Sequence, residues 1–260
     1  MIQNFHASVR DLPDSPPLAE EKEEGQQLST RQHWVWRKPS NPHLRYYQPM
    51  RGDTVGVSNS NKADQIGAPW GLNRISKGPR NRYRFDRSAG AGTWIYVLDS
   101  GIRLSHEDFG GRAEFGHDAT KPLLGAAKPQ PQDLEHGTHV ASTAAGVKYG
   151  VAKRAYIVDV KVIRHPKEKG SGGDNAAGLN GINWAVQDIQ ARNRVGRAVL
   201  NLSWGVPGLQ GVGWCEEVSY AINNAFELGI HVVIAAGNDN DLSDNHCPGN
   251  FKKSYHGWSH

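Results

Sequence analysis

Short apolar runs bounded by turn-forming residues recur along the chain from about Gly67 onward, a pattern typical of buried strands. Four strands are predicted in this way, at 93–98, 156–163, 197–203 and 230–236. Apolar residues at helical spacing predict helices between them, at 138–147, 175–191 and 216–228. Strands that alternate with helices favour a doubly wound α/β fold around a parallel sheet. Ligands of such sheets gather at the carboxyl ends of the strands.

The two ends of the chain show neither a helix nor a strand period. Residues 1–66 consist of an acidic, proline-bearing stretch followed by an aromatic and basic one. We expect this segment to be mobile, because it offers little apolar surface to offset the entropy lost on ordering. Residues 246–260 are predicted to form a divergent, frayed tail. The folded unit is therefore expected at 67–245.

Composition and charge narrow the choice of function only a little. The chain has 260 residues, enough for one or two domains, and 37% of them are apolar. No apolar run approaches the roughly 18 residues of a membrane span, and the first ten residues lack a secretion-signal pattern, so the compartment stays open. The net charge of +4 comes from scattered basic residues, and nucleic acid is not an expected partner.

Cysteine and histidine spacing does not predict a metal site. Cys215 and Cys247 are the only cysteines; they allow at most one disulfide and match no zinc spacing. His139 follows His136 by three residues, but no acid or cysteine stands where a third ligand would be needed. We interpret His139 as a packed helix residue, and no cofactor is predicted.

Three polar side chains are expected at one edge of the predicted sheet. Asp99 directly follows an apolar strand and precedes a small residue and a glycine, His136 lies in the first turn of a helix, and Asn238 follows another strand. Each alone is a common turn or cap residue. Together they supply the side-chain types that orient a base, act as a base and stabilise an oxyanion.

Six ordered motifs resemble subtilisin-like serine proteases, and in particular their proteinase K-like branch. Three resemble the aspartate, histidine and oxyanion-asparagine signatures: Asp99-Ser100-Gly101, His136-Gly137-Thr138-His139-Val140-Ala141 and Ala235-Ala236-Gly237-Asn238. The other three resemble the mature amino terminus, the segment after the histidine helix and the substrate-binding strand: 68–76, 149–152 and 201–205.

The resemblance implies a role for each polar residue. His136 would be the general base that takes the proton of a nucleophilic serine and later returns it to the leaving amine. Asp99 would hold the tautomer of that ring and stabilise the imidazolium. Asn238 would donate its side-chain amide to the tetrahedral oxyanion.

The resemblance also implies a cleft for an extended polypeptide. Two edge segments would hold the peptide by backbone hydrogen bonds, namely Ser203-Trp204-Gly205 and Gly170-Ser171-Gly172. Ala236 and Gly237 would complete the substrate-binding residues. Glycine suits such a cleft because a side chain would block the approach of a second main chain.

The nucleophile of the family does not occur in this sequence. It lies in a Gly-Thr-Ser-Met-Ala run, whereas the methionines here are Met1 and Met50. The serines after Asn238 are Ser243, Ser254 and Ser259, and none has the required neighbours.

We therefore expect the amino-terminal part of a serine endopeptidase domain, inactive by itself. The alternative is a non-catalytic module that binds peptides or a protein inhibitor. The family often binds calcium, but no calcium ligand is assigned here.

Overall fold

The computed structural model describes residues 61–79, 81–121, 135–164, 175–207, 213–251 and 255–257. The prediction of a mobile segment falls almost wholly on residues 1–60, which lie outside the described part of the chain.

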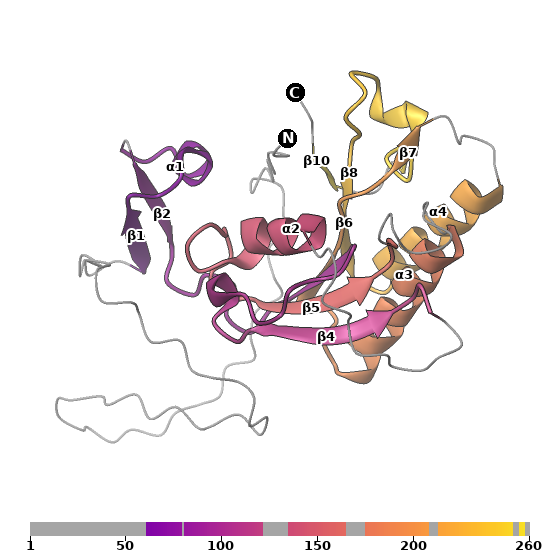
Figure 1. Cartoon of the computed structure of the whole chain (residues 1–260), viewed down its shortest axis with the longest axis horizontal. Helices are drawn as coiled ribbons and strands as arrows, with labels where there is room; N and C mark the ends of the chain where they lie inside the picture. Colours follow the sequence, from indigo (N-terminus) through magenta and orange to yellow (C-terminus); the bar gives the residue numbers. More distant parts are fainter. Residues whose placement is uncertain are drawn as a thin grey trace, which may run out of the picture.

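A parallel sheet forms the centre of the fold (Figure 1). Within the described residues it has six strands, in the order β10-β8-β6-β3-β5-β4, and every neighbouring pair is parallel. Their bounds are β3 (Trp94–Asp99), β4 (Ala113–Asp118), β5 (Tyr156–Lys161), β6 (Ala198–Leu202), β8 (His231–Ala235) and β10 (Tyr255–Gly257). The chain leaves β3 toward β4 and β5, then crosses back to β6, so the direction of winding changes at β3. This confirms the predicted doubly wound α/β fold.

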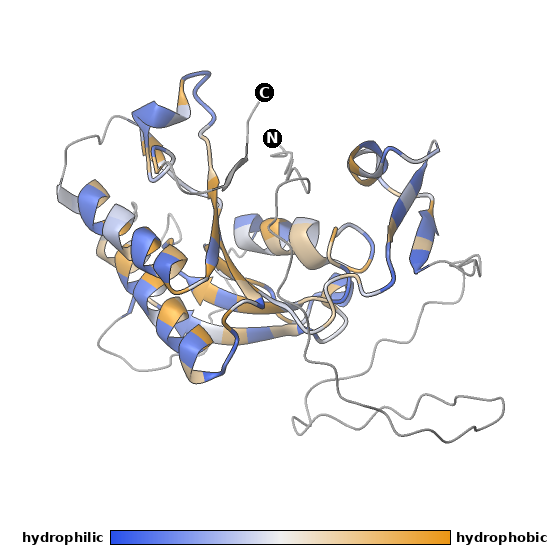
Figure 2. Cartoon of the chain, turned by 180° about the vertical axis from the view of Figure 1, so that it is seen from behind, coloured by the Kyte–Doolittle hydropathy of each residue, from blue (hydrophilic) through white to orange (hydrophobic). Residues whose placement is uncertain are grey.

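Helices cover both faces of the sheet (Figure 1). Helix α2 (Glu135–Ala145) lies on one face, and α3 (Asn175–Ala191) and α4 (Gly213–Glu227) lie on the other. The last two bury an apolar stripe and expose polar residues, which Figure 2 shows as alternating colours around each helix. All three helices begin within three residues of the predicted positions.

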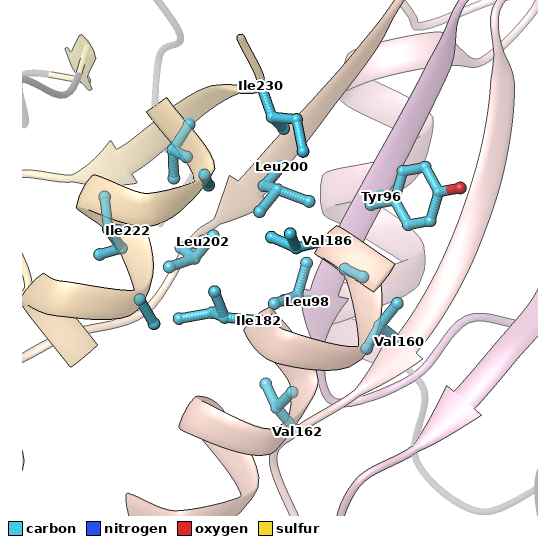
Figure 3. Close-up of a cluster of buried hydrophobic side chains, with 14 of the residues drawn as sticks. Tyr96, Leu98, Val160, Val162, Ile182, Val186, Leu200, Leu202, Ile222 and Ile230 are labelled. Atoms are coloured by element: carbon cyan, nitrogen blue, oxygen red, sulfur yellow. The ribbon is translucent and has the colours of Figure 1, made fainter. Parts of the chain in front are cut away.

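The two faces of β3 belong to different hydrophobic clusters, because successive side chains of a strand point to opposite faces. Tyr96 and Leu98 pack beneath α3 and α4, among the buried residues drawn in Figure 3. Val97 belongs to the smaller cluster beneath α2, with Val140 and Ile157. Asp99 is two residues beyond Val97 and therefore lies on the α2 face.

A small hairpin unit precedes the sheet. Strands β1 (Lys62–Ile66) and β2 (Arg82–Asp86) pair antiparallel, and helix α1 (Trp70–Ser76) packs Leu72 against Tyr83. The sequence placed 62–66 in the mobile segment. The structure differs there because β2 provides ladder hydrogen bonds and Arg84 pairs with Asp64 at 2.9 Å.

The chain after β8 is also more ordered than expected, up to Phe251 and again at β10. A short 3-10 helix, η3 (Ser243–Asn245), leads to β9 (His246–Cys247), which pairs antiparallel with β7 (Val206–Pro207). The two cysteines form the one disulfide that the sequence allowed, Cys215–Cys247, and thereby join α4 to β9. The expected frayed tail is therefore wrong at its start, because His246 and Cys247 are buried.

Strand β4 was not predicted. Its residues are mostly half-buried and do not alternate clearly, and a bulge lies between Phe115 and His117. In the described part of the chain, none of the helices combines the length and the hydrophobicity needed to cross a lipid bilayer.

Candidate active site

Asp99 ends β3 at the carboxyl edge of the sheet and is fully buried. The backbone turns sharply after it, with Gly101 at a φ of +104°, a conformation that glycine adopts without strain. The Ser100 amide donates a 2.6 Å hydrogen bond to the Asp99 carboxylate. The turn therefore fixes the carboxylate in place.

His136 lies in the first turn of α2 and contacts this carboxylate. Its Nδ1 atom is 2.8 Å from Oδ1 and 3.0 Å from Oδ2 of Asp99. The next residue, Gly137, donates its amide to the Ser100 hydroxyl at 3.1 Å. A Cβ atom on Gly137 would lie only 2.4 Å from the carbonyl oxygen of Gly101. Glycine at 137 thus allows the helix to approach β3 closely enough for the contact.

The pair has an asymmetric environment. The Asp99 side chain is fully buried, whereas 55% of the His136 side chain is exposed. The hydrogen bond from Asp99 raises the pKa of His136 above its usual value, although partial burial of the ring opposes this shift. Since Nδ1 faces Asp99, Nε2 is the nitrogen that can accept a proton from an approaching hydroxyl.

Ser203, Trp204 and Gly205 follow β6, the strand beside β3. The Trp204 indole donates a 2.9 Å hydrogen bond to the Leu98 carbonyl oxygen, which ties this segment to the strand that carries Asp99. Ser203 is buried and accepts a bond from the Asn201 amide at 2.9 Å. Gly205 is exposed.

Asn238 is exposed and follows β8, after a turn in which Gly237 has a φ of +104°. The register of β3, β6 and β8 places Asn238 at the same carboxyl edge of the sheet as Asp99 and Ser203. Val97 pairs with Asn201, and Asn201 pairs with Val233, so Asp99, Ser203 and Ala235 are level across three adjacent strands. Ala236 and Gly237 continue from there.

The structure therefore brings Asp99 and His136 into contact and puts the Ser203 and Asn238 segments at the same edge. Gly170, Ser171 and Gly172, which were also predicted for the site, lie outside the described part of the chain. His139 is exposed and not packed. Among the described residues, no group of three or more His, Cys, Asp or Glu side chains could hold a metal ion.

Two ionisable residues near the site were not predicted from the sequence. Asp159 and Lys161 are buried on β5, on the same face of the sheet as Asp99, which pairs in register with Lys161. Burial raises the pKa of Asp159 to about 7, although Ile102 and Lys161 partly offset the shift. The available signal was an acid and a base inside an apolar run.

Comparison with known proteins gives a consistent result. Residues 90–255 match the subtilase family. The chain is 41% identical over 178 residues to Alkaline protease 1 of Aspergillus oryzae, covering 68% of this chain and 40% of that protein. It is 42% identical over 196 residues to Subtilisin-like protease 4 of Trichophyton equinum, covering 74% and 45%. It thus spans less than half the length of these relatives.

A solved structure of a cold adapted subtilisin-like serine proteinase superposes with a TM-score of 0.59 at 32% identity, covering 73% of this chain and 63% of that one. The family match extends over more than half of the chain. The matched range includes the buried aspartate, the paired histidine and the parallel strands described above. The chain belongs to the subtilase family.

Proposed function

We propose that this chain supplies the acid–base pair, the oxyanion donor and part of the peptide cleft of a subtilisin-like serine endopeptidase. The observation that carries the proposal is the contact between a fully buried carboxylate, Asp99, and a half-exposed imidazole, His136, at the carboxyl edge of a parallel sheet. Membership of the subtilase family and the names of the fungal relatives support the same activity.

In this proposal His136 acts as the general base. Its Nε2 atom takes the hydroxyl proton of a serine as the oxygen attacks the peptide carbonyl, and then protonates the leaving amine. A helix amino terminus disfavours a positive imidazolium. The buried carboxylate of Asp99 offsets that effect and holds the proton on Nδ1.

Asn238 would donate its side-chain amide to the oxyanion of the tetrahedral intermediate. Loss of such a donor costs roughly 10²- to 10³-fold in kcat. Two observations support this role: Asn238 is exposed, and the strand register places it at the same edge of the sheet as the Ser203 segment. The substrate would be an extended polypeptide that pairs with the 203–205 backbone, as peptides do when they add a strand to an edge.

A serine in the Gly-Thr-Ser-Met-Ala context is not present among the 260 residues. We therefore expect the isolated chain to retain at most the roughly 10³- to 10⁴-fold acceleration over water that binding and an oxyanion donor provide. This is on the order of a million-fold below an intact triad enzyme.

The test is a chimera that joins this chain to the serine-bearing carboxyl half of a fungal alkaline protease. The chimera should cleave a chromogenic peptide and react with a serine-directed phosphonate, and His136→Ala should abolish cleavage. His231→Gln, at the exposed amino end of β8, serves as the matched control and should retain activity. Peptide or inhibitor binding without turnover in a correctly folded chimera would instead favour the non-catalytic module.

A further inference from the structure

The segment that follows the proposed oxyanion donor is held by a buried histidine. His246 is only 2% exposed, although it lies in a short strand at the surface of the fold. Its Nε2 atom is 2.8 Å from Oδ2 of Asp239, and its Nδ1 atom is 3.1 Å from the Leu242 carbonyl oxygen. Both ring nitrogens therefore face hydrogen-bond acceptors.

This geometry favours the charged form of the ring. A carbonyl oxygen only accepts hydrogen bonds, so Nδ1 must carry a proton. An ionised carboxylate also only accepts, so Nε2 must carry one as well. A ring that donates from both nitrogens is an imidazolium. The contacts of His246 therefore favour the imidazolium, with the exposed carboxylate of Asp239 as its counter-charge.

The ring also packs directly against the turn that carries Asn238. A Cβ atom on Gly237 would lie 2.8 Å from both Cδ2 and Nε2 of His246. The imidazolium therefore touches the residue before Asn238 and bonds to the residue after it, Asp239. It restrains the backbone on both sides of the proposed oxyanion donor.

His246 is itself anchored to the rest of the fold. It pairs with Pro207 across the β7–β9 ladder. The next residue, Cys247, is fully buried and joined by its disulfide to Cys215 of α4. The ring is therefore a fixed point against which the more exposed 237–242 turn is held.

We propose that His246 is a positioning residue, whose imidazolium fixes the turn 237–239 and so directs the side chain of Asn238 toward the oxyanion. The kinetic part of this proposal rests on the function proposed above. The structural part, a charged ring that orders the turn, does not depend on it.

The sign of the pH dependence follows from the groups around the ring. Asp239 and Asp241 face it from its own loop, and β7, which pairs with β9, contributes Val206 and Pro207, which do not titrate. The hydrogen bond to Asp239 raises the pKa of His246 above its ordinary value, although burial of the ring opposes this. The turn should thus be ordered while the ring is protonated and loosen as the pH rises through this raised pKa.

The first test uses the 260-residue chain and does not need activity. Nitrogen-15 NMR of the imidazoles should show both nitrogens of His246 protonated at acidic pH, with a titration midpoint above the ordinary value of about 6.5. Asp239→Asn should lower that midpoint. The amides of 237–245, corrected for intrinsic exchange, should lose about tenfold in protection once the ring is neutral. A midpoint at or below about 6.5, or a turn equally protected in both forms, would overturn the proposal.

The second test measures kinetics in the chimera described above. His246→Phe keeps a ring of similar size but loses both donors, and should lower kcat by about 10- to 100-fold with little change in KM, less than full loss of an oxyanion donor. His246→Gln retains one hydrogen-bond donor and should have a kcat between those of the parent and His246→Phe. Because glutamine does not titrate, the kcat of this variant should not fall further as the pH rises through the pKa of the parent's His246. His231→Phe is the matched control on β8 and should leave kcat unchanged.

The outcomes separate the two proposals. If no chimera cleaves peptide, the endopeptidase proposal fails, and the NMR measurements still decide whether His246 is charged and orders the turn. If the chimera is active and folded His246→Phe keeps its kcat, His246 does not position Asn238, while the endopeptidase proposal stands. Circular dichroism confirms folding of each variant, and Asp239→Asn tests the same contact where His246→Phe fails to fold.

Discussion

Asp99 and His136 are joined by hydrogen bonds of 2.8 and 3.0 Å, yet the carboxylate is fully buried and the imidazole is 55% exposed. The two residues are 37 positions apart and come from a strand end and a helix start. The hydrogen bond to the buried Asp99 is the largest influence on the pKa of the His136 ring. The exposed side of the ring remains accessible to a substrate.

The His136 ring should titrate above the ordinary histidine value of about 6.5, because Asp99 favours its charged form. Asp99→Asn should lower the midpoint. A raised pKa means that the contribution of this pair to stability is complete below about pH 6.5 and is lost as the pH rises through the folded-state pKa. Exposure of the ring keeps this contribution small. Two-dimensional NMR titration of both proteins measures the shift, and an unchanged midpoint in Asp99→Asn would contradict the assigned cause.

Gly137→Ala should destabilise the protein by about 1–3 kcal/mol, because the added Cβ would meet the Gly101 carbonyl oxygen at 2.4 Å and α2 must move. The same movement should alter the chemical shifts of the His136 ring. Gly71→Ala in α1 is the matched control, since a Cβ there meets no atom within 4 Å. It should stabilise the chain slightly, by up to about 1 kcal/mol. Urea unfolding of the three proteins provides the comparison, and equal effects of the two substitutions would refute the packing argument.

Asp159→Asn should stabilise the protein at pH 8. Burial raises the pKa of Asp159 from 3.8 to about 7, so the folded state holds a proton that the unfolded state releases. Stability due to this group therefore falls as the pH rises from about 4 to about 7 and then levels off. The variant should gain up to about 4 kcal/mol over the parent at pH 8 and almost nothing at pH 4.

Asp118→Asn is the control for this experiment. Asp118 is also buried, but it accepts a 3.0 Å hydrogen bond from the Thr120 amide, so its replacement should not stabilise the chain. Thermal unfolding across pH 4–8 measures both variants. A parent and an Asp159→Asn protein that respond to pH alike would show that the carboxyl group is ionised in the folded state.

Arg194→Met should cost about 3–5 kcal/mol, because it removes the cation from a buried network. The guanidinium donates to the Tyr96 hydroxyl at 2.7 Å and to Glu114 at 3.1 Å, and it lies 4.6 Å from the centroid of the Trp94 ring. Arg192→Met is the matched control. Arg192 pairs with Glu114 and with Asp188 but is 48% exposed, so its loss should cost at most about 1 kcal/mol. Urea unfolding midpoints measure the stability of both variants. Comparable losses of stability in the two would mean that burial of Arg194 adds little to the strength of its ion pairs and hydrogen bonds.

The spacing of apolar residues along the chain was enough to predict the alternation of strands and helices, and with it the parallel sheet. These features were predictable because apolar spacing is a local property and because parallel strands place their carboxyl ends at one edge. Local spacing also placed Asp99 and Asn238 after strand ends and His136 at a helix start, but the roles proposed for them came from the resemblance of their motifs to subtilisin-like proteases.

Which side chains meet, and which are buried, could not be predicted from this spacing and is seen in the folded structure. Strand β4 needs β5 as a partner, and Asp159 has a raised pKa only because helices and strands from elsewhere exclude water around it. The raised pKa of His246 depends on Asp239 and Leu242, and its burial depends on the pairing with β7 and the disulfide to α4. Hydrogen bonds and burial between such segments depend on distances in space, which the spacing of residues along the chain does not specify.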